Sequence, residues 1–423
     1  MQEKSNTLRS KYVFIVLFAI LISSIRANAY SLLTHEAIID VSWKKSIEPL
    51  LLKKYPGSSA EELVKAHAHA YGGAVMPDIG YSPFGSMLYT NLVHNVSSGD
   101  YIQALLDEAQ NLNEYAFALG SLSHYMADVY GHSVGTNVAV PITYEKLRAE
   151  FGDLVTYADH HKSHSRVEVS FDVLQTARGN YATKAYHDFI GFDVSREVVE
   201  RAFYKTYGLQ VTDVFRSLAL AISTYRWVIK SLLPNIVRAA WATKKSALKQ
   251  AEPGIKAQKF SFKMKNSTYY HQYGRDLQKA GFIPTIISFI IPILPKLGPL
   301  SKLKYKPPSA EAERLFIKSF DSTLVNYQAY LGKLNSKLPH LTNKTLDTGG
   351  EAIFGKYSIT DESHADLLLK LHKKNFENLS PLVARNLLEY YKNANPVWSK
   401  KRDLKKWSEI KTALDGLNEF TSE

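Results

Sequence analysis

The chain contains the stretch Phe117-Ala118-Leu119-Gly120-Ser121-Leu122-Ser123-His124-Tyr125-Met126-Ala127-Asp128. It is apolar, lacks proline and places a histidine and an aspartate four residues apart, so it predicts a helix with His124 and Asp128 on one face. Both polar side chains stand among apolar residues, where a buried histidine and a buried carboxylate need polar partners. A divalent metal ion would satisfy both.

A second pair has the same spacing, in His164-Ser165-Arg166-Val167-Glu168. One such pair is more often a surface contact or a helix cap. Two pairs about forty residues apart indicate a metal site, because nine of the fourteen histidines lie between His35 and His164. The same part of the chain also offers further candidate ligands, namely His35, Asp78, His94 and His132.

Composition narrows the classes of protein. The 423 residues are 45% hydrophobic and 22% charged, which is typical of a folded globular chain and excludes wholesale disorder, a collagen-like chain and a coiled coil. The absence of cysteine excludes disulfide scaffolds, thiol nucleophiles, zinc ribbons and iron–sulfur clusters. Metal ligands must therefore come from histidine, carboxylates or the backbone.

Apolar residues recur every three or four positions almost throughout, which predicts an all-α fold. Gly72 and Gly73, followed by Pro77, predict a loop. The segments with the clearest helical pattern are Ala60–Ala70, Tyr101–Asn111, Glu114–Tyr130, Glu197–Lys205, Thr212–Leu232 and His364–Tyr391.

The N-terminus has the pattern of a signal peptide over residues 1–29. Lys11 precedes the uncharged apolar run Val13–Ile22, and Ala27-Asn28-Ala29 has the small residues of a cleavage site before Tyr30. We therefore expect an exported protein, periplasmic or secreted. A retained N-terminal anchor is the alternative.

The two halves of the sequence differ in net charge. The net charge is +12, but residues 30–225 sum to −7 and residues 226–423 to +16. This predicts two units, residues 30–240 and a basic, mainly helical region of residues 241–423. Within the second, Gly281–Pro295 is apolar and broken by prolines, so it is either a buried kinked segment or an interfacial loop. The positive charge also predicts peripheral contact with anionic membranes.

The order of these residues resembles the bacterial zinc-dependent phospholipase C family, which is related in fold to the single-strand-specific zinc nucleases. Phe117–Asp128 is the most specific part of the resemblance, which covers roughly residues 30–225. The resemblance implies a multi-helix catalytic domain over residues 30–240 that holds two or three zinc ions. The residues that carry it are Tyr30, His35, Asp78, His94, His124, Asp128, His132, His164 and Glu168.

The resemblance also implies how these ligands are shared among the ions. One zinc would be held by the free amine and carbonyl of Tyr30, by His35 and by a bridging Asp128. A second would be held by Asp78, His94, His124 and Asp128, and a third by His132, His164 and Glu168.

The third group leaves alternatives. His160 and His161 precede His164 closely enough that one of them could replace it. His132 follows Asp128 more closely than in the best-known phospholipases, and we expect Gly131 to end the helix and turn His132 inward. The remaining histidines are interpreted as ordinary surface or core residues, with His67 and His69 facing solvent; the others are His187, His271, His340, His364 and His372.

Clustered zinc ions suit phosphodiester hydrolysis. The expected activity is that of a phospholipase C, which cleaves glycerophospholipids to diacylglycerol and a phosphorylated head group, with Asp78 as a ligand and candidate general base. The alternatives are a zinc-dependent nuclease or other phosphoesterase, and a zinc-stabilised surface-binding protein without turnover. The sequence contains no specific nucleic-acid-binding motif.

Overall fold

The computed structural model describes residues 32–177, 180–181, 192–229, 305–334, 340–377, 379–394 and 401–422. Within these ranges the regular structure is helical, and the only β-type pairing is an isolated bridge between Lys344 and Glu351. The predicted all-α fold is therefore confirmed for this part of the chain. The signal peptide, Tyr30 and Gly281–Pro295 lie outside the described residues.

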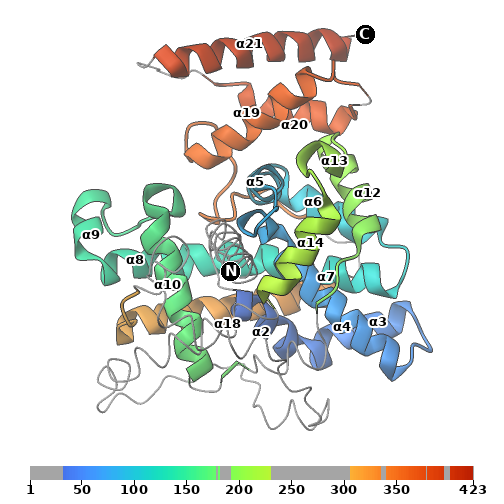
Figure 1. The fold of residues 1–423 in the computed structure, drawn as a ribbon, viewed down its shortest axis with the longest axis vertical. Helices are drawn as coiled ribbons and strands as arrows, with labels where there is room; N and C mark the ends of the chain where they lie inside the picture. Colours follow the sequence, from blue (N-terminus) through green and yellow to red (C-terminus); the bar gives the residue numbers. More distant parts are fainter. Residues whose placement is uncertain are drawn as a thin grey trace, which may run out of the picture.

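The helices before residue 230 form the larger part of the molecule (Figure 1). In chain order they are α2 (Leu32–Ser42), η1 (Trp43–Ile47), α3 (Glu48–Lys54), α4 (Ala60–Val75), η2 (Met76–Tyr81), α5 (Met87–Asn95), α6 (Ser98–Glu108), α7 (Leu112–Tyr130), η3 (Gly131–Thr136), α8 (Asn137–Thr143), α9 (Glu145–Phe151), α10 (Tyr157–Ala177), α12 (Arg196–Tyr207), α13 (Val211–Val214) and α14 (Leu218–Trp227). The later helices are α18 (Ala310–Lys333), α19 (Ser358–His372), α20 (Pro381–Tyr391) and α21 (Lys401–Ser422).

The crossing of α4 and α7 is the closest helix contact in the centre of the fold. A Cβ atom on Gly73 would lie 1.9 Å from the carbonyl oxygen of Phe117, and one on Gly120 would lie 2.0 Å from that of Ala70. Only glycine permits this approach of backbone to backbone. The prediction of a loop at Gly72-Gly73 is therefore wrong, because these glycines serve helix packing within α4.

The helix α18 follows residue 305 but packs against α7, η3 and α8. Its Tyr327 hydroxyl donates to the carbonyl oxygen of Leu119 at 2.8 Å, in the middle of α7. At the opposite end of the long axis, α19 packs against α5 and against α21 (Figure 1). The described residues after 305 thus share one buried apolar core with the N-terminal helices. The boundary at residue 240 lies outside the described residues and stays a prediction.

One predicted helix, Thr212–Leu232, is interrupted. After α13 the chain is extended at Phe215, whose side chain is buried, and Ser217 then caps α14 by accepting from the backbone N–H of Leu220. The periodicity suggested one continuous helix because the apolar residues on both sides of the break face the same core.

A second predicted helix, His364–Tyr391, is also two helices. The chain leaves α19 through Asn375 and Phe376, which have φ angles of 52° and 55°, and α20 begins at Pro381. Left-handed backbone at two successive non-glycine residues cannot continue a right-handed helix. The side chain of Phe376 is buried, which anchors this turn in the core.

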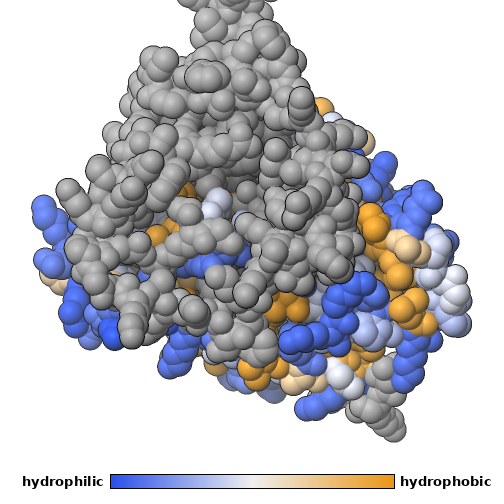
Figure 2. Space-filling model, turned by 90° about the horizontal axis from the view of Figure 1, so that it is seen from below, coloured by the Kyte–Doolittle hydropathy of each residue, from blue (hydrophilic) through white to orange (hydrophobic). Residues whose placement is uncertain are grey.

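The described helices and their exposed apolar side chains can be compared with what a membrane-spanning segment requires. None of the described helices is both long and apolar enough to cross a bilayer. On the face shown in Figure 2, the coloured residues include both hydrophilic and hydrophobic ones. The large exposed apolar side chains are scattered over several helices and loops, for example Phe84, Leu154, Val325 and Leu404.

His364 of α19 allows a prediction on pH and stability. Its ring stacks on Tyr390 with a centroid distance of 3.4 Å, and its Nδ1–H donates to the carbonyl oxygen of Thr360. Burial lowers the pKa of His364 to about 4, whereas an unfolded histidine titrates near 6.5. The neutral folded ring thus contributes stability above pH 6.5, and that contribution is lost as the pH falls toward 4.

Replacing His364→Phe keeps an aromatic ring on Tyr390 but removes the titration. The free energy of unfolding should fall between pH 6.5 and pH 4 in both proteins. We expect the fall to be about 3 kcal/mol smaller in the variant than in the wild type. Urea unfolding at a series of pH values measures this difference. Parallel pH profiles for the two proteins would contradict it.

Candidate metal centre

Eight of the nine predicted ligands are described, and the structure brings all eight together in the interior. Each is at most 5% exposed. They form three groups in which the candidate ligand atoms lie within 4.8 Å of one another: His35 with His124 and Asp128, Asp78 with His94 and His124, and His132 with His164 and Glu168. The ninth, Tyr30, lies outside the described residues.

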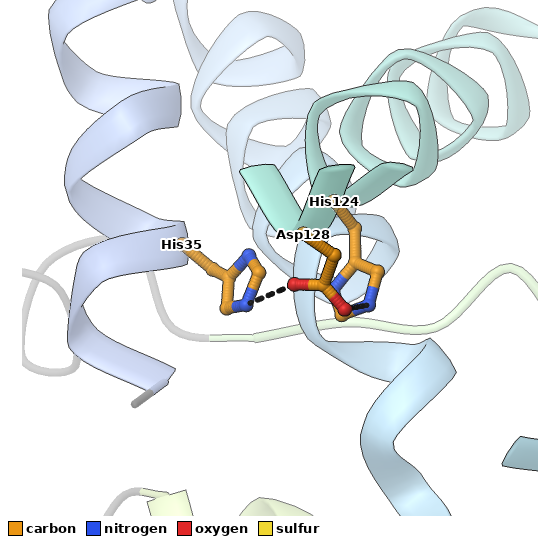
Figure 3. Close-up of side chains that lie close together, drawn as sticks. All are labelled: His35, His124 and Asp128. Carbon is orange, nitrogen blue, oxygen red and sulfur yellow. Dashed lines mark ion pairs between the residues drawn. The ribbon is translucent and has the colours of Figure 1, made fainter. Parts of the chain in front are cut away.

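Asp128 lies between two of these groups. Its Oδ1 is 3.5 Å from Nε2 of His35, on α2, and its Oδ2 is 3.2 Å from Nε2 of both His94, on α5, and His124, on α7. Figure 3 shows the carboxylate with His35 on one side and His124 on the other. This is the arrangement that a carboxylate bridging two ions requires.

Backbone carbonyls determine which nitrogen of each ring faces the centre. Nδ1 of His94 donates to the carbonyl oxygen of Thr90 at 2.8 Å, and Nδ1 of His124 donates to that of Ala74 at 2.9 Å. Carbonyls only accept, so both protons lie on Nδ1. When both rings are neutral, the two Nε2 atoms face each other with lone pairs at 3.1 Å, which is unfavourable unless a proton or a metal ion lies against them.

The electrostatics of this region also favour a positive charge. Burial alone would lower the pKa of His94, but Asp128 and Asp78 outweigh it and raise this pKa well above its usual value. Burial would raise the pKa of Asp128, but the neighbouring His124 and His94 hold it well below the usual range. Burial lowers the pKa of His35 to about 3, so its ring is neutral near pH 7, as a metal ligand must be.

The third group has its own support. Nδ1 of His164 is 2.6 Å from Oε1 of Glu168, and the opposite nitrogen, Nε2, donates to Oδ1 of Asn137 at 2.8 Å. The ring of His132 stacks on that of His164, and neither of its buried nitrogens makes a hydrogen bond within the described residues. Such a buried ring is costly unless a ligand satisfies it.

A π-helical turn places His132. We expected Gly131 to end the helix, but its φ of −63° and ψ of −47° keep the backbone in the right-handed helical region. The chain instead continues from α7 into the wider turn of η3, and His132 is buried there. A π turn inserts one residue per turn and so redirects the side chains that follow.

The two alternative histidines lie elsewhere. His160 sits at a kink in α10, with φ −153° and ψ 74°, and its Nδ1 accepts from the backbone N–H of Ser163. It therefore caps the second part of the helix. His161 is exposed, so in the described structure the histidine that joins His132 and Glu168 is His164.

The expectation that His67 and His69 face solvent is wrong, since they are only 1% and 9% exposed. His67 stacks on Trp43 and pairs with Asp40 at 3.1 Å, and Nδ1 of His69 lies 2.8 Å from the hydroxyl oxygen of Ser195. Burial lowers the pKa of both rings, that of His69 to about 4. They are core residues, since α4 packs against both α2 and α7.

One acidic residue near the centre was missed in the sequence. Oδ1 of Asp347 lies 3.7 Å from Nε2 of His132. The only acid at ligand spacing from it is Glu351, four residues later, and no histidine stands at that spacing. Asp347 also lies outside the stretch that carries the resemblance. Only the fold brings it to this place.

Comparison with known protein families agrees with this geometry. The model of the zinc dependent phospholipase C family matches residues 34–217, a range that contains all eight described candidate ligands. Residues 34–217 are thus similar to this family. No curated protein and no solved structure matches the chain.

The donor set fits the ion of a zinc-dependent phospholipase C. Neutral imidazoles and carboxylates are common zinc ligands, and the facing nitrogens of His94 and His124 together with the unsatisfied ring of His132 are polar atoms that an ion would satisfy. The resident zinc would be held by the three groups listed above.

Metal removal should therefore destabilise the protein. We expect two or three zinc ions per purified chain, and a lower melting temperature after treatment with a strong chelator, because the buried donors lose their common partner. Ion binding at a thousand times its Kd would contribute about 4 kcal/mol per site. Elemental analysis and thermal melts check this, and a chain with well under one metal per molecule would contradict it.

Asp128→Asn tests the central carboxylate. We expect it to weaken the binding of two ions, because Asp128 lies beside donors of two groups. Glu168→Gln should weaken the binding of one ion. The unfolding free energy should fall by about 3–5 kcal/mol, as when one partner of a buried charged pair is removed. Exposed Asp107→Asn, in the same domain, is the control and should retain all its zinc. Equal metal content in all three variants would refute the bridging arrangement.

Proposed function

We propose that the protein is an exported zinc-dependent phosphodiesterase, a phospholipase C that hydrolyses glycerophospholipids to diacylglycerol and a phosphorylated head group. The observation that carries the proposal is the set of three buried donor groups around Asp128, within the matched family segment. So many buried donors exceed what a single structural ion requires, since four ligands close such a site.

Zinc at these groups would lower the pKa of bound water to about 7 and neutralise the phosphate oxygens. Asp78 is the candidate base. It is buried at the start of η2, and its Oδ1 lies 3.3 Å from Nε2 of His94. From there its carboxylate would hold the attacking water and accept its proton.

The chain keeps these groups in their reactive form. The backbone of Thr90 and Ala74 holds the protons of His94 and His124 away from the centre, so their Nε2 atoms remain donors for the ion. Asn137 does the same for Nε2 of His164 and leaves Nδ1 beside Glu168. No ring therefore has to rotate to present this nitrogen to an ion.

Export and membrane contact belong to the same proposal. The signal-like residues 1–29 support export, with Tyr30 as the first residue of the processed chain and a zinc ligand. The charge of +16 over residues 226–423 supports contact with anionic lipid. On α21, exposed Leu404 and Phe420 lie on the same helix as the lysines Lys405 and Lys411.

The deciding experiment compares substrates. Protein beginning at Tyr30 is incubated with vesicles of phosphatidylcholine, with and without added phosphatidylglycerol, with phosphatidylinositol vesicles and with single-stranded DNA. We expect diacylglycerol release that chelator stops and added zinc restores, and faster release from vesicles that contain anionic lipid. Asp78→Asn should lower kcat by about 10²–10⁴-fold, as for loss of a general base, and Asp107→Asn should not.

Other outcomes would contradict the proposal. Cleavage of DNA without lipid hydrolysis would indicate a nuclease on the same metal site. Zinc binding without turnover on either substrate would indicate a zinc-stabilised binding protein.

A further inference from the structure

The segment Leu341–Gly350, called here the C-terminal strap, runs from beyond α18 to the metal centre. Its backbone is tied to the family domain: the N–H of Leu346 donates to the carbonyl oxygen of His94 at 3.0 Å, and the carbonyl oxygen of Thr342 accepts from the hydroxyl of Tyr125 at 2.7 Å. His94 is a ligand, and Tyr125 lies between His124 and Asp128 on α7. The strap therefore lies against α5 and α7, two of the helices that carry candidate ligands.

Asp347 is the acidic residue that the strap places at the centre. Its Oδ2 accepts from the hydroxyl of Tyr357 at 2.7 Å, and its Oδ1 lies 3.7 Å from Nε2 of His132. Its backbone carbonyl accepts from Nδ2 of Asn137 at 2.7 Å. Since Oδ1 of Asn137 orients His164, one amide positions both the histidine and the strap.

The separation of Asp347 and His132 fits shared coordination. Zinc binds imidazole nitrogen and carboxylate oxygen at about 2.0–2.2 Å, which puts two ligand atoms of a tetrahedral ion about 3.3–3.6 Å apart. The observed 3.7 Å is close to this spacing. The other carboxylate near His132, that of Asp128, is farther away at 3.9 Å, and both its oxygens also face other histidines.

Charge supports the same assignment. His132 and His164 would bind as neutral rings and Glu168 contributes one negative charge, so a divalent ion in this group keeps one uncompensated positive charge. The Asp347 carboxylate, whose side chain is only 13% exposed, neutralises it. An excess charge in a buried site is costly, and a fourth anionic donor relieves it.

We propose that Asp347 is the fourth protein ligand of the ion held by His132, His164 and Glu168. The inference rests on the zinc centre of the proposed function but not on its lipid substrate. If Asp347 is a ligand, the C-terminal strap supplies part of the third site, and this site is complete only when the strap is in place. Tyr357 is then a positioning residue, which acts through Asp347.

The test measures zinc rather than turnover. Full-length processed protein and the variants Asp347→Asn and Asp347→Ala are titrated with zinc against a chromophoric chelator, and metal content is measured by elemental analysis. We expect the affinity for one ion to fall at least about tenfold, more in Asp347→Ala because an asparagine oxygen can still coordinate. Tyr357→Phe should give a smaller loss. Glu351→Gln, an exposed acid next to the strap, is the matched control and should behave as the wild type.

Two further measurements separate coordination from folding. The metal-free forms of wild type and Asp347→Asn should melt at the same temperature, whereas their zinc-loaded forms should differ. The double variant Asp347→Ala/Glu168→Gln should lose only one ion, because both residues serve the same site. In the cobalt-substituted protein, Asp347→Asn should change the visible absorption of one ion.

The outcomes distinguish the two proposals. Unchanged zinc affinity in both Asp347 variants, or an equal loss of stability in the metal-free and zinc-loaded forms, would overturn the role of Asp347 alone. A double variant that loses two ions would also overturn it. A wild-type chain that binds no zinc would overturn both this inference and the proposed function.

Discussion

The contact between α4 and α7 is the constraint on which the metal centre depends. Gly73 and Gly120 allow the two backbones to touch, and the next carbonyl along α4, that of Ala74, accepts the Nδ1 proton of His124. The helix α4 ends two residues after Gly73, at Val75, and is followed directly by η2 (Met76–Tyr81), which carries Asp78. A larger side chain at either glycine would push the helices apart and so move both ligands.

The ligand side chains are held in place before any ion is considered. Three histidines donate one ring proton to Thr90, Ala74 and Asn137, and these acceptors belong to the helical framework. The opposite nitrogens then converge on carboxylates in the interior. Without a cation this arrangement concentrates lone pairs and negative charge at low dielectric, so metal binding and folding stability are coupled.

The parts of this site that follow from local helix geometry could be predicted from the sequence. The pairs His124/Asp128 and His164/Glu168 share helix faces because four residues make about one turn. Asp78 and His94 have no such spacing to the others, so the sequence offered them only as further candidates and the family resemblance assigned them to an ion. The loop predicted at Gly72-Gly73 was wrong because a glycine can also mark a close helix contact. The chain break at Phe215 could not be found from periodicity, since the apolar pattern continues across it.

The family segment and the site do not have the same extent. Residues 34–217 contain the eight described ligands, yet α18 donates the Tyr327 hydrogen bond into α7, and the strap brings Asp347 to His132. Tyr327 and Asp347 lie more than a hundred residues beyond the match. A chain ending at residue 217 would expose the face of α7 that α18 covers and would leave the surroundings of His132 open to water. The described residues of α18 and the strap therefore pack around the candidate metal centre, although they lie outside the matched segment.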